Sequence, residues 1–281
     1  MSLRLIASTR PRVHHDALNW ARRVASNGGA VSQSTLRAVS TFCDAIDRAA
    51  IRDRFFRLNL FCGTADASLI AVRTPLYRGP SLAGTQYGNT LDTNVNFAIT
   101  DYAETGASGG LNPGASNASR YLNTGLTPDA LPSRATGHMS YWRVAGSEAV
   151  TFTRLTMGSE SSGAYRMDER SSGQFGFWGS YSGAANAVAN AAGHRLVSRT
   201  SATSLTLYSN GSSVGTNATS TTPVASSFPW FVFNSNSNGT PSGSWSNFIL
   251  RMYSIGDGMT DPQSLAFYNA LAAFNTALSR T

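Results

Sequence analysis

Eight short strand candidates follow one another between residues 120 and 254, and turn residues separate them. Several alternate apolar with polar side chains, and most are rich in β-branched and aromatic residues. The candidate strands are residues 120–124, 138–144, 150–157, 174–181, 195–199, 204–208, 230–234 and 247–254. A series of this kind predicts an antiparallel β-sandwich.

The composition supports this fold class. Ser, Thr, Asn and Gly account for 110 of the 281 residues, and these residues favour turns and strands over helices. The apolar content of 41%, with 14 Phe, 10 Tyr and 5 Trp, is too high for a disordered chain. No long apolar run occurs and the first residues lack an apolar segment, so we expect neither a membrane span nor a signal peptide.

Helical periodicity occurs near both ends of the chain. Asp16 can cap a first short helix, and Ser32 or Ser34 can cap a second one. The second helix has an apolar stripe of Leu36, Val39, Phe42, Cys43, Ile46 and Ala50. A final helix that begins at Thr260 or Asp261 has the stripe Leu265, Phe267, Tyr268, Leu271, Phe274 and Leu278. We expect these two stripes to pack on each other or on the sandwich.

Charge is unevenly distributed. Residues 1–60 contain 10 Arg and 4 acidic residues, whereas residues 61–281 contain 12 Arg and 11 acidic residues, and the chain has no Lys. We therefore expect three parts: a basic arm and helical anchor at 1–60, an irregular Gly- and Asn-rich connection with short strands at 61–117, and the sandwich with its closing helix at 118–281. Removing residues 1–60 is expected to leave a folded body.

Four segments carry a family resemblance. They are Arg120-Tyr121-Leu122-Asn123-Thr124-Gly125, Gly137-His138-Met139-Ser140, residues 204–211 with Val214-Gly215, and residues 248–256. Together they resemble a laminin G-like domain of the concanavalin A-type jelly roll. The basic helical start and the Phe-Tyr-Asn-Ala-Leu helix are similar to proteins from the structural modules of tailed phages and prophages. The resemblance implies a mainly β, antiparallel jelly-roll sandwich (concanavalin A-like) with an N-terminal helical segment and a C-terminal helix.

The same resemblance implies a function. We expect a non-enzymatic virion structural protein of a phage or phage-like particle, either a capsid decoration protein or a head or tail fibre component. It would be made in the host cytoplasm, contact other virion proteins in many copies or as a homo-oligomer, and dock through its N-terminal region. The alternative is a carbohydrate-binding, lectin-like module that recognises a host surface glycan. The Glu-x-Asp-x-x-Glu strand of glycosidases with this fold is absent, which disfavours a third option, a polysaccharide-degrading enzyme.

One aromatic group is a candidate binding site for a sugar or a protein surface. It consists of Tyr165, Arg166, Trp178 and Tyr181. On a strand with a period of two, Phe175 and Phe177 face opposite to Trp178, so Trp178 can stand on an exposed face. The alternative interpretation is a half-buried sheet residue.

A second group is a candidate docking surface. It consists of Arg48, Arg52, Arg54, Phe55 and Arg57, in which arginines alternate with acidic and aromatic residues. Planar guanidinium groups suit an acidic protein surface. A solvated face is the alternative, and nucleic acid is disfavoured because no readout motif is present.

Metal and catalytic signals are weak. Asp92, Asp101 and Glu104 in a Gly- and Asn-rich loop could hold calcium, although such residues are also common in turns. Neither the four histidines nor Cys43 and Cys62 form a ligand motif, and no cofactor is expected. The acidic residues Glu148, Glu160, Asp168 and Glu169 are expected at turns or strand ends.

Overall fold

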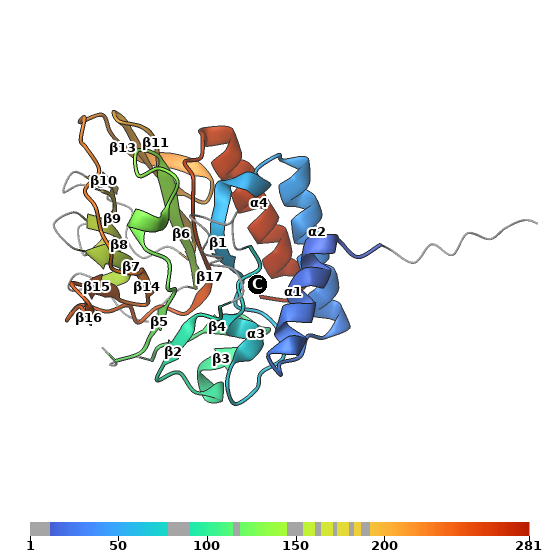
Figure 1. Ribbon diagram of the computed structural model, residues 1–281. Coiled ribbons are helices and arrows are strands. Elements are labelled where there is room, and N and C mark those ends of the chain that lie inside the picture. The colour runs from blue at the N-terminus through green and yellow to red at the C-terminus, as the bar shows by residue number, and fades with distance from the viewer. Residues whose placement is uncertain are drawn as a thin grey trace, which may run out of the picture.

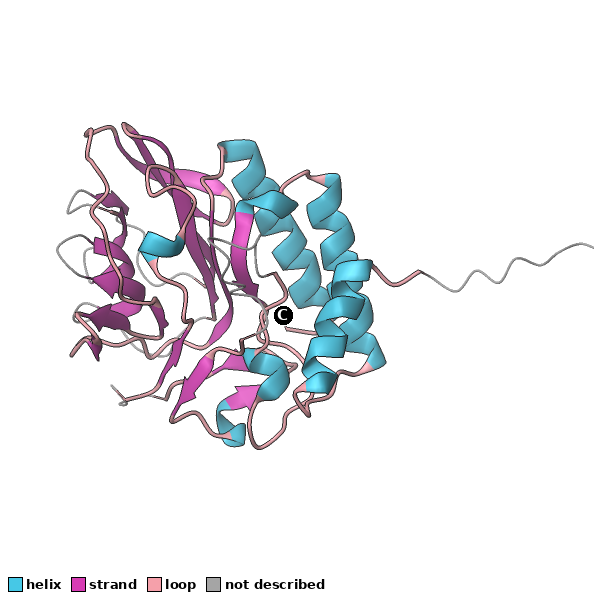
Figure 2. Cartoon of the chain, in the orientation of Figure 1, coloured by secondary structure: helices cyan, strands magenta, loops and turns pink. Residues whose placement is uncertain are grey.

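Two β-sheets pack face to face, and helices cover the outer side of one of them (Figures 1 and 2). The computed structural model describes residues 12–77, 90–114, 119–144, 154–160, 164–170, 173–179, 183–186 and 192–280. The helices in these residues are α1 (His15–Ser26), α2 (Gln33–Arg48), the short α3 (Ile70–Arg73) and α4 (Asp261–Ala277). None of these helices is long and apolar enough to span a bilayer.

The sheet that the helices cover is called the helix-backed sheet here. Its eight described strands centre on β6 and β17, which pair antiparallel from Gly256↔His138 to Leu250↔Arg143. In spatial order they are β13 (Ser212–Asn217), β12 (Ser204–Ser209), β11 (Gly193–Ser201), β6 (Gly137–Arg143), β17 (Leu250–Gly256), β4 (Gly110–Leu111) and β3 (Tyr102–Ala103), with β1 (Phe55–Asn59) paired to β17.

The opposite sheet contains nine described strands. Its spatial order is β10 (Gly183–Asn186), β9 (Gly173–Trp178), β8 (Ala164–Arg170), β7 (Arg154–Glu160), β14 (Phe231–Val232), β5 (Tyr121–Asn123) and β2 (Thr93–Val95), while β15 (Ser235–Ser237) pairs with β7 and β16 (Thr240–Pro241) with β15. The β15–β7 pairing is parallel, and the other pairings between described strands are antiparallel.

Side chains along β6 point alternately into two apolar cores, one on each side of the helix-backed sheet. Met139 and Tyr141 point into the core between the sheets, which also contains Trp178 and Trp230. Trp142 points the other way and packs at the edge of the core under the helices. Because successive side chains of a strand face opposite sides, one strand contributes to both layers.

The helical layer joins the two ends of the chain. Ser32 Oγ caps α2 by accepting from Thr35 N at 3.1 Å, and Gln263 Oε1 accepts from Thr260 N at 2.9 Å at the start of α4. Phe42 of α2 lies edge-on to Phe274 of α4, with ring centroids 5.9 Å apart. The expected packing of the two stripes is confirmed for most of their residues, whereas Leu265 and Ala50 are exposed.

The predicted fold class is confirmed, and so is the turn at Asn210-Gly211. These two residues have φ values of 50° and 79° between the antiparallel strands β12 and β13, as an Asn-Gly hairpin requires. One central strand differs from expectation. Asp168 and Glu169 were expected at turns or strand ends, yet they lie within β8, which pairs with β7 on one side and β9 on the other. Its four charged residues obscure the strand pattern.

The N-terminal region is packed into the same fold as the sandwich. β1 pairs with β17, and the N-terminal residues Trp20, Phe42 and Phe55 share one buried cluster with Phe267 of α4. Deleting residues 1–60 would remove a strand and expose the outer face of the helix-backed sheet. Against the expectation from the sequence, we therefore predict that this deletion destabilises the sandwich.

We predict that Phe274→Ala lowers the free energy of unfolding by about 3 to 5 kcal/mol, because it leaves a cavity between α2 and α4. Leu265 on the same helix is 47% exposed, so Leu265→Ala is the matched control and should change stability by less than about 1 kcal/mol. Urea unfolding measures both variants. Equal midpoints for the two would contradict the helical layer described here.

Two buried histidines lie on the helix-facing side of the helix-backed sheet. Burial lowers the pKa of His138 to about 4, even though Nδ1 bonds Asp257 O. Burial also lowers the pKa of His194 to about 3, and the neighbouring Arg195 lowers it further. Among the described residues, neither ring nitrogen of His194 has a hydrogen-bond partner. Both rings are therefore held neutral in the folded chain.

Acid should destabilise the protein through these two histidines. The unfolded chain takes up protons near pH 6.5, whereas the folded rings do so only near pH 4 and 3. Their contribution is fully present above pH 6.5 and is lost as the pH falls, by about 1.4 kcal/mol per histidine per pH unit. In urea unfolding between pH 6.5 and 4.5, His194→Leu should halve the combined loss of stability per pH unit that the two histidines cause. An unchanged slope would show that His194 is not buried as a neutral ring.

Candidate functional site

The aromatic candidates lie in the core. Tyr165 on β8 and Trp178 on β9 are both 0% exposed, and Trp178 stacks on Trp230 with ring centroids 6.1 Å apart. Gly137 makes room for the indole, since a Cβ there would lie 1.8 Å from the Trp178 ring. The expectation that Trp178 is exposed for stacking is wrong, because the buried face of β9 carries Trp178 and the outer face carries Phe177. Tyr181 lies outside the described residues.

Arg166 lies on the outer face of the opposite sheet. Its guanidinium carbon is 4.7 Å above the Phe177 ring, and Nη1 lies 3.3 Å from Glu160 Oε1. It points away from Tyr165 and Trp178, which face the inter-sheet core. The structure therefore does not join Arg166 to these two aromatic residues in one site.

The docking candidates differ from one another in exposure. Phe55 and Arg57 are both 0% exposed, so a surface role for them is wrong. Arg57 Nε donates to Asp92 Oδ1 at 3.0 Å and to Tyr253 Oη at 2.9 Å. This buried pair links β1 to β17 and to the chain near residue 92.

The other three arginines of that group are reachable by solvent. Arg52 pairs with Asp16 at 2.9 Å and lies over the Tyr77 ring. Arg54 pairs with Asp257 at 2.6 Å. Arg48 is exposed at the end of α2. Of the five docking candidates, Arg48 is the one whose exposed charge fits a docking role.

The proposed calcium ligands do not converge. Asp92 is buried and accepts from Tyr253 Oη at 2.7 Å as well as from Arg57. Asp101 pairs with Arg120, while Glu104 accepts from Thr35 Oγ1 and Gly63 N. Among the described residues these three carboxylates have separate partners, which supports the alternative interpretation as structural residues over a shared calcium site.

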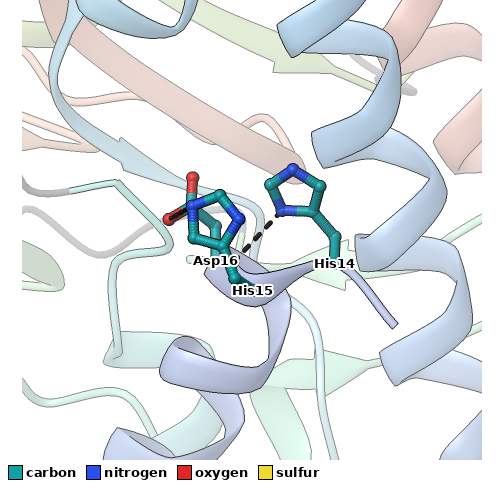
Figure 3. Close-up of side chains that lie close together, drawn as sticks. All are labelled: His14, His15 and Asp16. Atoms are coloured by element: carbon teal, nitrogen blue, oxygen red, sulfur yellow. Dashed lines mark hydrogen bonds and ion pairs between the residues drawn. The ribbon is translucent and has the colours of Figure 1, made fainter. Parts of the chain in front are cut away.

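One group of possible metal ligands occurs at the start of α1, where His14, His15 and Asp16 lie close together (Figure 3). Each already has a structural partner. His14 Nδ1 accepts from Asp16 N and its Nε2 lies 2.9 Å from Asp47, while Asp16 pairs with Arg52. The arrangement is that of a helix cap, and its charges are satisfied within the chain.

A pocket of about 540 Å³ opens where α4 ends over the helix-backed sheet. We call it the arginine pocket and define it by Trp142, Arg251, Tyr268, Asn275 and Arg280. These residues come from β6, β17, α4 and the chain after α4. Ser108 and Thr276 add exposed hydroxyl groups at its rim. A concave site with a few converging polar groups is the usual form of a ligand site.

Arg251 enters the pocket because β17 bulges there. Leu250 pairs with Arg143 and Met252 with Trp142, so Arg251 has no partner on β6. A bulge redirects its side chain out of the regular alternation. Arg251 Nε donates to Gly109 O at 3.1 Å and Nη2 to Ala107 O at 2.9 Å. Among the described residues, Nη1 makes no hydrogen bond.

Arg280 is placed by the end of α4. Ser279 has a φ of 53°, Ser279 N bonds Thr276 O, and Arg280 N bonds Asn275 O, which together form a Schellman motif. The chain therefore turns back over the helix end. Arg280 Nε then donates to Glu104 O at 2.6 Å and Nη2 to Phe61 O at 2.7 Å.

Asn275 provides an unpaired amide. It lies on the last turn of α4 and is 4% exposed, yet neither Oδ1 nor Nδ2 has a hydrogen-bond partner in the described part of the chain. A buried polar group without a partner is costly, so such groups mark places where a partner is missing. Half-exposed Tyr268 lies nearly parallel to Trp142, with ring centroids 5.7 Å apart.

The pocket is cationic. Arg251 and Arg280 are 8% and 1% exposed, and neither has an ion pair with a described carboxylate. The carboxylate of Glu104 is engaged with Thr35 and Gly63. Burial lowers the pKa of Arg251 to about 10, and the neighbouring Arg280 lowers it further, so Arg251 stays charged at neutral pH.

Sequence reasoning missed this site. Its residues are separated by up to 138 positions from Trp142 to Arg280 and share no motif. The signal that could have found Arg280 is its place two residues after the apolar stripe of the last helix. Nothing in the pattern of 247–254 indicates the bulge at Arg251.

Comparisons with known proteins support the fold. No family model matches the chain, and no curated protein matches it by sequence. A mutant of Trypanosoma rangeli sialidase that displays trans-sialidase activity is similar in structure, with a TM-score of 0.51 and 8% identity, over 85% of this chain and 39% of that one.

Two further solved structures are more distant. The binding domain of botulinum neurotoxin DC in complex with rat synaptotagmin II has a TM-score of 0.43 and 10% identity, over 56% of this chain and 42% of that one. The NanB sialidase from Streptococcus pneumoniae has a TM-score of 0.42 and 12% identity, over 55% of this chain and 27% of that one. The chain thus spans less than half of each of the three, and the likeness to the T. rangeli protein is one of fold alone.

Proposed function

We propose that this chain is a non-catalytic, lectin-like module that binds a saccharide in the arginine pocket. The observation that carries the proposal is the buried amide of Asn275, which has no partner among the described residues and lines the same pocket as the half-exposed ring of Tyr268. A sugar ring offers hydroxyl groups to an amide and an apolar face to an aromatic ring. The volume of about 540 Å³ suits a ligand of one or two sugar rings.

The acidic residues support a binding role over hydrolysis. No Asp or Glu is among the described residues that line the arginine pocket, whereas most glycoside hydrolases use a pair of carboxyl groups. Glu169, which is 1% exposed, accepts from Tyr141 Oη at 2.9 Å and pairs with Arg143 in the interior. It therefore has a structural role within the sandwich.

We predict that Asn275→Ala weakens glycan binding about tenfold or more while the thermal midpoint stays equal or rises. Removing an unpaired buried amide relieves a cost, and Ala is the better helix former. Binding is measured on a glycan array and then by calorimetry on the best ligand. Asn19→Ala, an exposed position on α1, is the matched control.

Unchanged binding by Asn275→Ala would place any glycan site elsewhere. Failure of the full-length chain to bind any glycan on the array would overturn the proposal itself.

The second candidate function is a structural component of a phage or phage-like particle, of the laminin G-like kind. A groove of about 400 Å³ between α2 and α4 favours it. Its lining combines exposed Arg48 with small side chains, namely Ala38, Ala45, Ala49, Ala266, Ala270, Ala273 and Ala277. Small side chains let another element approach closely, and Arg48 suits an acidic surface on a particle protein.

Co-sedimentation with tailed-phage particles that lack this chain tests the second candidate. Arg48→Glu together with Ala273→Glu, both at exposed positions, should abolish co-sedimentation at unchanged thermal midpoint. Arg22→Glu on α1 is the control and should co-sediment like the wild type. If the double variant co-sediments as well as the wild type, the α2–α4 groove is not the docking surface.

A further inference from the structure

We infer that the saccharide bound in the arginine pocket is acidic and that its oxyanion, a carboxylate or a sulfate, binds to Arg251. This inference rests on the proposed function, since it names the class of ligand for the same site. It follows from the charges around the pocket, whereas the proposed function follows from Asn275 and Tyr268.

The charge of the pocket is unbalanced. Two guanidinium groups lie together with exposures of 8% and 1%, close enough that the charge of Arg280 lowers the pKa of Arg251. Their described partners are the carbonyl oxygens of Gly109, Ala107, Glu104 and Phe61, which carry no formal charge. Buried arginines are normally paired with a carboxylate, as Arg57 is with Asp92.

The hydrogen bonds of Arg251 show which atom is free for a ligand. Arg251 Nε and Nη2 donate to the carbonyl oxygens of Gly109 and Ala107, which belong to the loop of residues 104–109. This fixes the guanidinium plane and leaves Nη1 without a partner among the described residues. A donor held in this way binds an oxyanion with little loss of side-chain freedom, and a charged hydrogen bond is stronger than a neutral one.

The remaining groups of the pocket select a sugar over a simple anion. Asn275 offers the donor group Nδ2 and the acceptor Oδ1, neither of which has a partner among the described residues, and this pair matches a hydroxyl group better than an oxyanion. Tyr268 and Trp142 provide an aromatic wall. A pyranose that carries one oxyanion uses all three kinds of contact at once, whereas free acetate or sulfate uses only Arg251.

The test is calorimetric titration of the full-length chain with matched pairs of oligosaccharides. Each pair has the same linkage and differs in one group: a uronate disaccharide against its neutral hexose counterpart, and a sulfated disaccharide against its unsulfated form. Gluco, galacto and manno pairs are all included. At least one acidic member should bind about tenfold or more tightly than its neutral partner. The uronate and sulfate arms distinguish the two oxyanions.

Variants assign the preference to Arg251. Arg251→Gln should reduce the ratio of acidic to neutral affinity to about one, Arg251→Lys should keep part of it, and Arg22→Gln on α1 should keep all of it. The ratio is informative even if Arg251→Gln lowers the thermal midpoint, because a purely structural loss weakens both members of a pair equally. A full acidic preference in folded Arg251→Gln would overturn the inference.

The remaining outcomes separate this inference from the proposed function. Equal binding of acidic and neutral sugars would overturn the acidic ligand and leave the lectin-like function standing. Binding of free acetate or sulfate with no sugar bound would overturn the lectin-like function and the acidic saccharide with it. No binding of any probe would overturn both.

Discussion

The outer face of the helix-backed sheet is apolar, and both ends of the chain are needed to cover it. Phe55 of β1, Phe42 of α2 and Phe267 of α4 meet in one buried cluster, although more than 200 residues separate the first two from the third. Burial of each such side chain stabilises the fold by roughly 1.5 to 3 kcal/mol. This requirement fixes where α4 lies and therefore where the chain after it ends (Figure 1).

The arginine pocket is a consequence of that placement. The Schellman turn at the end of α4 directs Arg280 toward the 104–109 loop, and the bulge in β17 directs Arg251 toward the same loop. The fold thus brings two positive charges together without a described carboxylate between them. Arg57, in contrast, has a described carboxylate partner, because Asp92 balances its charge.

The sequence predicted the layers of the fold better than its site. Period and capping signals located α2, α4, the β12–β13 turn and most central strands, because these signals are local. β8 was missed because Arg143 of the other sheet balances the charge of Glu169, which the local sequence pattern does not reveal. The alternation of side chains along the strand showed that Trp178 faces opposite to Phe177, but it did not show which of the two faces is buried. That choice depends on Gly137, from another strand.

The most direct measurement is a crystal structure of the chain with an acidic disaccharide selected by affinity. We expect the ligand in the arginine pocket, with its oxyanion within hydrogen-bond distance of Arg251 Nη1, a hydroxyl group on the Asn275 amide and a ring face against Tyr268. A ligand seated on the outer face of the opposite sheet, near Arg166 and Phe177, would show that the arginine pocket is not the saccharide site, and so would an arginine pocket that holds only water.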